Sequence, residues 1–226
     1  MKNYLFSILI ILIFAGCTSQ KNSEEFINAT SGRYLFNANE VLEIYFKEQV
    51  LHAKWRGNDN IALLKVNDSS FYMKELNEKM LFVSKPEMHI ELAPKTEHDG
   101  VIYHFKKLTK GEKTASEYFK DKEYNNALIA FKKIQEKDSL NPEIKERRIN
   151  RLGYNYIRNK EIDAAIEIFK INIALYPNSS NVYDSMGDAF LSKKDTAAAI
   201  TYYKKAISIN PENSSAKKAY KKLTSK

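Results

Sequence analysis

The stretch "NVYDSMGDAFLSKKDTAAAITYYKKAISINPEN", residues 181–213, repeats the pattern of "RINRLGYNYIRNKEIDAAIEIFKINIALYPNS", residues 148–179. An internal period of this length indicates stacked helix pairs. Small residues suit places where helices cross closely, proline ends the second helix, and the aromatic rings are expected between neighbouring pairs. At a spacing of 34, five positions carry the same or a similar residue: Gly153 and Gly187, Tyr156 and Phe190, Ala165 and Ala199, Phe169 and Tyr203, and Pro177 and Pro211.

This pattern resembles the tetratricopeptide repeat, a helix-turn-helix unit of about 34 residues. A weaker copy precedes the two clear ones and is followed by a longer loop, "EKDSLNPE". A further departure lies in the second repeat, where Asn172 stands at a position at which the family prefers alanine. The final "SSAKKAYKKLTSK" is expected to form the capping helix that such stacks need. The resemblance therefore predicts three repeats and a cap over residues 111–226. In the weaker copy the glycine, first-aromatic, alanine and second-aromatic places hold Ala115, Tyr118, Ala127 and Phe131.

Residues 31–109 have a different period, in which apolar and polar residues alternate in short runs. Turn-forming segments such as "RGNDN" and "EHDG" separate these runs. Seven or eight strands at this spacing predict a small antiparallel β sandwich or barrel. The predicted fold class is therefore α+β, with this β domain followed by an α-helical solenoid. The apolar phases of four runs are Leu42, Ile44 and Phe46; Leu51, Ala53 and Trp55; Met88, Ile90 and Leu92; and Val101, Tyr103 and Phe105.

The segment "GRYLFNANEVLEIYFKEQVLHAKWRG", residues 32–57, looks like the small β module that follows the catalytic domain in bacterial serine hydrolases of the β-lactamase and penicillin-binding type. The repeat segment is also similar to the tails of such hydrolases. Ser214 and Lys217 satisfy their S-x-x-K pattern and Tyr124 begins a Y-x-N, but K-T-G is absent from the chain. Ser214 is better explained as a helix N-cap. The resemblance thus implies accessory parts without the enzyme, and we expect no catalytic residue and no cofactor.

The N-terminal stretch "SILIILIFAGCTSQ", residues 7–20, contains Cys17, the only cysteine of the chain. Its apolar run is shorter than the roughly 20 residues that span a bilayer, and it lies between a positive start and small residues, as in a secretory signal. "FAGC" resembles the bacterial lipobox, although Phe14 replaces the usual leucine. The prediction is a signal peptide over 1–16, lipidated Cys17, and a linker over 17–30. A plain cleaved signal or an uncleaved anchor are the alternatives.

The charge differs between the two halves. Residues 18–110 carry 13 basic and 13 acidic residues, whereas residues 111–226 carry 22 and 15 and a net charge of +7. This suggests two modules with different partners. Nucleic acid is not expected as a partner of an exported protein, and the lysines near the C-terminus have the spacing of a solvated helix face. Binding to an acidic lipid or polysaccharide surface is a second use for these lysines.

The four histidines, His52, His89, His98 and His104, all lie in the β half. Three of them share the solvent phase, and Glu91 is two residues from His89. A metal site would need three or four ligands to converge from neighbouring strands. Scattered histidines on a wet sheet face are the ordinary outcome, so we expect no metal site.

The first helix of each tetratricopeptide repeat lines the concave groove, so the resemblance also implies a set of partner-binding positions. Arginine grips carboxylates with a planar fork, and tyrosine and arginine are common interface anchors. We therefore expect the groove to bind an acidic or C-terminal segment of another envelope protein, with Asp184 and Asp188 setting its orientation. The positions are Arg147, Asn150, Arg151, Tyr154 and Arg158 in the second repeat, and Asn181, Asp184, Asp188 and Leu191 in the third.

The predicted function is a non-enzymatic scaffold or adaptor of the bacterial envelope, anchored by lipid on the periplasmic side or at the cell surface. Three alternatives remain. The groove positions could simply be solvated. The chain could be an accessory subunit or non-catalytic remnant of a serine hydrolase. The β domain could bind a small ligand near Trp55, although the phase of Trp55 favours packing in the core.

Overall fold

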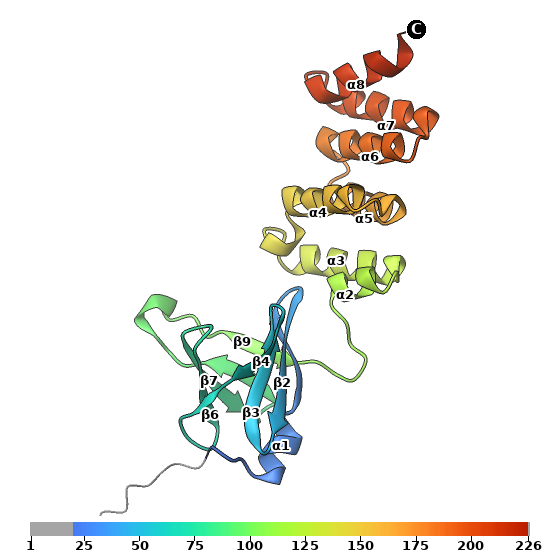
Figure 1. Cartoon of the computed structure of the whole chain (residues 1–226). Coiled ribbons are helices and arrows are strands. Elements are labelled where there is room, and N and C mark those ends of the chain that lie inside the picture. Colours follow the sequence, from blue (N-terminus) through green and yellow to red (C-terminus); the bar gives the residue numbers. More distant parts are fainter. Residues whose placement is uncertain (1–19, 226) are drawn as a thin grey trace, which may run out of the picture. The chain divides into compact units, whose positions relative to one another are not determined.

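The computed structural model describes residues 20–225. The described residues divide into two compact units, one holding residues 20–34 and Leu42–Lys107, the other holding Leu35–Val41 and residues 108–225. We call the strand-containing part the β unit and the part with helices α2 to α8 the helical unit (Figure 1). The predicted α+β fold class is confirmed. The predicted signal peptide over residues 1–16 and the predicted lipidation site Cys17 lie outside the described residues. Among residues 20–225, no helix is both long and apolar enough to span a membrane.

Within residues 20–225, nine strands form one sheet in the order β4-β3-β2-β1-β9-β8-β7-β6-β5, and the sheet curls into a barrel-like shape (Figure 1). Neighbours from β2 to β4 and from β5 to β9 pair antiparallel. The strands are β1 Gly32–Asn37, β2 Glu40–Lys47, β3 Val50–Trp55, β4 Asn58–Ala62, β5 Leu64–Lys65, β6 Ser70–Met73, β7 Glu78–Val83, β8 His89–Leu92 and β9 His104–Lys107.

The alternation of apolar residues decides which face of the sheet points inward. Leu42 and Ile44 of β2 are buried, and so are Leu51, Ala53 and Trp55 of β3, as their shared phase predicts. Strands β2 and β3 therefore bury one row of side chains and leave the other row facing outward.

One predicted strand is shorter than its pattern suggests. Val101 and Tyr103 are 53% and 43% exposed, and β9 begins only at His104. Asp99 and Gly100 both have left-handed backbone angles, with φ of 49° and 77°. They turn the chain directly after the 3₁₀ helix η1, Thr96–His98, so the alternation before His104 belongs to a loop.

The predicted linker over 17–30 is wrong for the part that the structure describes. Helix α1, Glu24–Thr30, begins with a hydrogen bond from the Phe26 amide to the Ser23 side chain. The Phe26 ring lies against three aromatic rings of the β unit at centroid distances of 5.5–6.1 Å, those of Phe46, Phe71 and Phe82. Burial of an aromatic side chain is a large stabilising contribution, so this segment is part of the fold.

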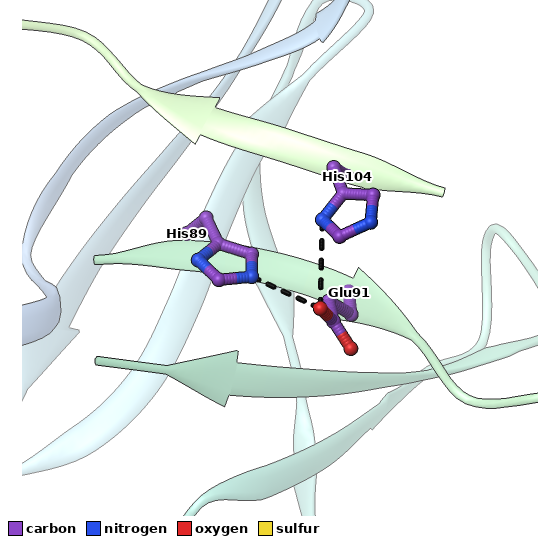
Figure 2. Close-up of side chains that lie close together, drawn as sticks. All are labelled: His89, Glu91 and His104. Carbon is purple, nitrogen blue, oxygen red and sulfur yellow. Dashed lines mark hydrogen bonds and ion pairs between the residues drawn. The ribbon is translucent and has the colours of Figure 1, made fainter. Parts of the chain in front are cut away.

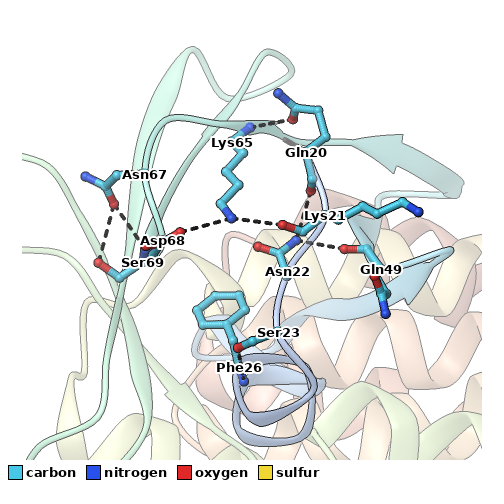
Figure 3. A network of polar contacts seen from close by, with 10 residues as sticks. All are labelled: Gln20, Lys21, Asn22, Ser23, Phe26, Gln49, Lys65, Asn67, Asp68 and Ser69. Carbon is cyan, nitrogen blue, oxygen red and sulfur yellow. Dashed lines mark hydrogen bonds and ion pairs between the residues drawn. The ribbon is translucent and has the colours of Figure 1, made fainter. Parts of the chain in front are cut away.

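Polar contacts hold the chain just before α1 in place (Figure 3). The Asn22 backbone and side-chain amides both donate to the Gln49 carbonyl at 2.9 Å. The Lys65 ammonium donates to the Lys21 carbonyl at 3.0 Å and pairs with Asp68 at 3.1 Å. Residues 20–22 therefore run along the β unit in a fixed path.

The helical unit consists of antiparallel helix pairs, α2 with α3, α4 with α5 and α6 with α7, followed by α8. The loop with the predicted extra residues contains a 3₁₀ turn, η2 Pro142–Ile144, which buries Ile144 completely. The helices are α2 Ala115–Lys120, α3 Tyr124–Lys137, α4 Glu146–Arg158, α5 Ile162–Leu175, α6 Ser180–Ser192, α7 Thr196–Ile209 and α8 Ser214–Thr224.

The repeated glycines sit where the two helices of a pair touch. A Cβ atom at Gly187 would lie 2.5 Å from Cε1 of the Tyr203 ring, and Gly153 faces Phe169 in the same way. These rings therefore pack within their own helix pair, whereas the prediction placed them between pairs. Tyr156 does contact a neighbouring pair, as predicted, since its ring lies 5.5 Å from that of Phe119.

The capping helix α8 is present, but its N-cap differs from the prediction. Asn213 caps it, since its side chain accepts a hydrogen bond from the Ala216 amide at 3.0 Å, and Ser214 is the first helical residue. One face of α8 buries Ala216 against the last repeat. Its lysines are exposed, as a solvated cap requires.

Replacing Ala199 by leucine should destabilise the helical unit by about 1–3 kcal/mol, because it overpacks a completely buried position next to Tyr203. Ser208→Leu on the same helix adds a comparable side chain at an exposed position and should change stability little. Thermal unfolding of the full chain, followed by far-ultraviolet circular dichroism, measures both. Equal melting temperatures for the two variants would contradict the register of α7.

Candidate functional site

One face of α4 gathers five of the predicted partner-binding residues. At about 100° per residue, these positions fall within about 100° of the helix circumference. They line an open hollow of about 570 Å³ together with Asn181 from α6, the first helix of the next pair. The five residues are Arg147, Asn150, Arg151, Tyr154 and Arg158.

We call this hollow the arginine groove. Its three arginines are exposed. Among residues 20–225, none of them forms an ion pair with a carboxylate. Arg148, which lies between two of them in sequence but outside the groove, pairs with Glu143 at 2.9 Å. The groove thus keeps its positive charge available for a ligand.

The wall formed by α6 is polar and internally bonded. Asn181 donates to the Glu146 carboxylate at 2.8 Å, which joins the N-terminal ends of α4 and α6. The Tyr154 hydroxyl donates to Asp188 at 2.6 Å and lies 3.2 Å from the Ser185 hydroxyl. These bonds fix the tyrosine ring beside the arginines.

Asp188 is the centre of a network that sequence reasoning did not find. Its two carboxylate oxygens accept from Tyr154 of α4 and from Tyr203 of α7, each at 2.6 Å. Burial first, and then the bond to Asp188, raises the pKa of both tyrosines, so both hydroxyls stay protonated and donate. The aspartate therefore connects two consecutive helix pairs.

This differs from the predicted role of Asp184 and Asp188 as groups that orient a partner. Asp188 is already bonded on both oxygens, and Asp184 is only 7% exposed. Burial raises the pKa of Asp184. Neither aspartate lines the arginine groove, and neither does Leu191, which is 39% exposed. Of the third-repeat positions, Asn181 alone is among the lining residues of this hollow.

The arginine groove is suited to binding anions. Three guanidinium groups without carboxylate partners can form paired hydrogen bonds with carboxylates, and a half-buried tyrosine beside them offers a ring for stacking. Binding at an open, solvent-facing surface fits an extended segment better than an enclosed small molecule.

The β unit contains a second cluster. His89, Glu91 and His104 each offer a ligand atom, and these atoms all lie within 4.8 Å of one another. The sequence showed that they share a phase, but only the pairing of β8 with β9 places His104 opposite Glu91. His98 instead pairs with Glu78 at 3.1 Å. Trp55 is 9% exposed, in agreement with packing in the core.

Comparison with known families bears directly on the helical unit. Family models described as "Tetratricopeptide repeat" match residues 151–179 and 180–213. The helical unit contains tetratricopeptide repeats. The matched ranges correspond to the second and third predicted repeats, and the pair α2 and α3 precedes them.

A chloroplast tetratricopeptide repeat domain-containing protein of Arabidopsis thaliana, PYG7, is 28% identical over 64 residues, which is 28% of this chain. The chain spans about a fifth of that relative, 21% of its length. Similar solved structures include the first tetratricopeptide repeat domain of Spaghetti (RPAP3) bound to an HSP90 peptide, with 23% identity, a TM-score of 0.33, and coverage of 48% of this chain and 83% of the other. MamA shows 21% identity, a TM-score of 0.33, and coverage of 50% and 63%.

Proposed function

We propose that this chain is a non-enzymatic interaction scaffold whose arginine groove binds an acidic or C-terminal carboxylate segment of another protein. The observation that carries the proposal is the set of three exposed arginines on one face of α4, without carboxylate partners among residues 20–225. Stacked helical repeats form concave surfaces for protein partners. Tetratricopeptide repeats are typically interaction modules, which agrees with this use of the groove.

The fixed tyrosine supports a specific ligand rather than a diffuse one. Tyr154 is bonded to Asp188, so the ring is held in place before a partner binds. A preorganised aromatic anchor loses little conformational entropy on binding. Carboxylates spaced along a peptide can then reach Arg151 and Arg158 while an apolar side chain rests on the ring.

The location of this scaffold is also part of the proposal. The "FAGC" sequence at residues 14–17 supports lipidation of Cys17, and therefore a place on a bacterial envelope membrane. The partner would then be another envelope protein.

Replacing Arg151 and Arg158 together by alanine should abolish recovery of the partner from native membranes, because the groove loses two of its three guanidinium groups. The measurement is a pull-down with the tagged chain, followed by identification of the bound protein. A synthetic peptide with the C-terminal sequence of that protein, as free acid and as amide, then tests the carboxylate directly by fluorescence polarisation.

A matched control is Lys132→Ala with Lys133→Ala, which removes the same charge from exposed positions of α3 outside the groove. This variant should retain the partner. Far-ultraviolet circular dichroism checks that both variants are folded. If the arginine variant recovers the partner as well as the lysine variant does, the binding surface lies elsewhere in the chain.

A further inference from the structure

The outward face of the β unit brings together three side chains that are common metal ligands (Figure 2). His89 and Glu91 are two residues apart on β8 and share a face. His104 is the register partner of Glu91 on β9. The neighbouring residues Ile90 and Phe105 are buried, which directs the three ligand side chains away from the core. Central strands of a sheet hold such a set firmly.

The hydrogen bond at the other ring nitrogen of His89 determines where its lone pair points. Nδ1 lies 2.7 Å from the Glu87 carbonyl oxygen. A carbonyl can only accept, so Nδ1 carries the proton and the lone pair of the neutral ring is on Nε2. A backbone carbonyl bonded to the second nitrogen is the usual support of a metal-binding histidine.

This assignment leaves two hydrogen-bond acceptors, Nε2 of His89 and Oε1 of Glu91, facing each other. Nε2 of His89 lies 3.0 Å from Oε1 of Glu91, and Nδ1 of His104 lies 3.4 Å from the same oxygen. Lone pairs at this distance repel unless a positive species lies between them. That species is either a proton on the imidazole or a metal ion.

The distances fit a metal ion. Ligand atoms about 2.0–2.1 Å from a tetrahedral zinc ion are about 3.3 Å apart. The separations of 3.0 and 3.4 Å are close to that value. The third separation, between a ring nitrogen of His89 and one of His104, is at most 4.8 Å. The His104 side chain is 55% exposed, so a small rotation can shorten it.

We propose that His89, Glu91 and His104 bind one divalent transition-metal ion, with Zn²⁺ as the best-matched metal. Two imidazoles and one carboxylate suit Zn²⁺, Cu²⁺ and Ni²⁺ and discriminate against Mg²⁺ and Ca²⁺. Three protein ligands leave a fourth position open to water or to an outside group. Leu81 and Val83 of β7 stand in register with Glu91 and His89 and form an apolar flank to the site.

The test is isothermal titration of the purified full chain with Zn²⁺ and, separately, with Mg²⁺, using an affinity tag without histidines. Wild type should bind one Zn²⁺ per chain and no Mg²⁺. His104→Ala should weaken Zn²⁺ binding by at least about tenfold. Glu91→Gln, which keeps the side-chain size, should weaken it as well.

His52→Ala is the matched control, since His52 also faces outward but lies on β3, away from the cluster. It should bind Zn²⁺ as wild type does. Nitrogen-detected NMR of the histidine rings gives a second readout, in which Zn²⁺ shifts the Nε2 resonance of His89. Equal affinity of wild type and His104→Ala, or an unchanged His89 resonance, would show that a proton alone occupies the site and would overturn the proposal.

Discussion

Replacing Asp188 by alanine should lower the free energy of unfolding of the helical unit by about 2–4 kcal/mol. Its carboxylate accepts from Tyr154 and Tyr203 at 2.6 Å each. A buried hydroxyl left without an acceptor costs about 1–3 kcal/mol. Tyr203 is completely buried and cannot turn to water, whereas Tyr154 is half-buried and recovers part of its loss. The melting temperature should fall by roughly 10 °C.

Far-ultraviolet circular dichroism follows this transition, because the helices dominate the signal. Asp163→Ala removes the same side chain from an exposed ion pair with Lys193, and such pairs contribute little. Its melting temperature should stay close to that of wild type. Adding Tyr203→Phe to Asp188→Ala removes the unpaired hydroxyl. The free energy of unfolding of the double variant should therefore fall by less than the sum of the decreases in the two single variants. Additive losses would mean that the network does not couple the helices.

The repeats could be predicted from sequence because their constraint is local and periodic. Gly187 must be small where Tyr203 fills the same space, and a spacing of 34 residues makes such a position visible twice. The resemblance to the tetratricopeptide repeat gave Arg151 and Arg158 as groove positions, and the structure brings them into one hollow. Residues that repeat with the helix period can be placed on a face without a structure.

The bonding of the aspartates could not be predicted in this way. The groove positions implied by the repeat family included Asp188. In the structure its oxygens accept hydrogen bonds from tyrosines of α4 and α7, which are 34 and 15 residues away in sequence. Which side chains meet across helices depends on rotamers and on the spacing between pairs. A periodic pattern contains neither.

The β unit shows the same limit more strongly. Alternation predicted the inward rows of β2 and β3, since it depends only on the strand period. It could not predict that His104 would stand opposite Glu91, because that requires the strand order. It also missed α1, since a single seven-residue helix has too few turns to show a period, and Phe26 packs through contacts distant in sequence. The likeness of residues 32–57 to hydrolase accessory modules stays a prediction.

Replacing Cys17 by serine should abolish lipidation completely and release the protein from membranes. Cys17 is the only thiol of the chain, so no other side chain can form the thioether of a bacterial lipid anchor. Each buried methylene contributes about 0.8 kcal/mol, and a single acyl chain gives only marginal binding. Two or three chains on one residue would therefore account for the whole durable attachment.

Growth with a clickable fatty acid, followed by fractionation of membranes, measures both effects in one experiment. Wild type should carry the label and sediment with membranes, and Cys17→Ser should carry no label and appear in the soluble fraction. Thr18→Ala leaves the thiol in place and should behave as wild type does. The outcomes also separate the two alternatives for this segment. An unlabelled wild type in the soluble fraction would indicate a plain cleaved signal. An unlabelled wild type that still sediments would indicate that residues 4–14 act as an uncleaved anchor, and either result would contradict lipidation of Cys17.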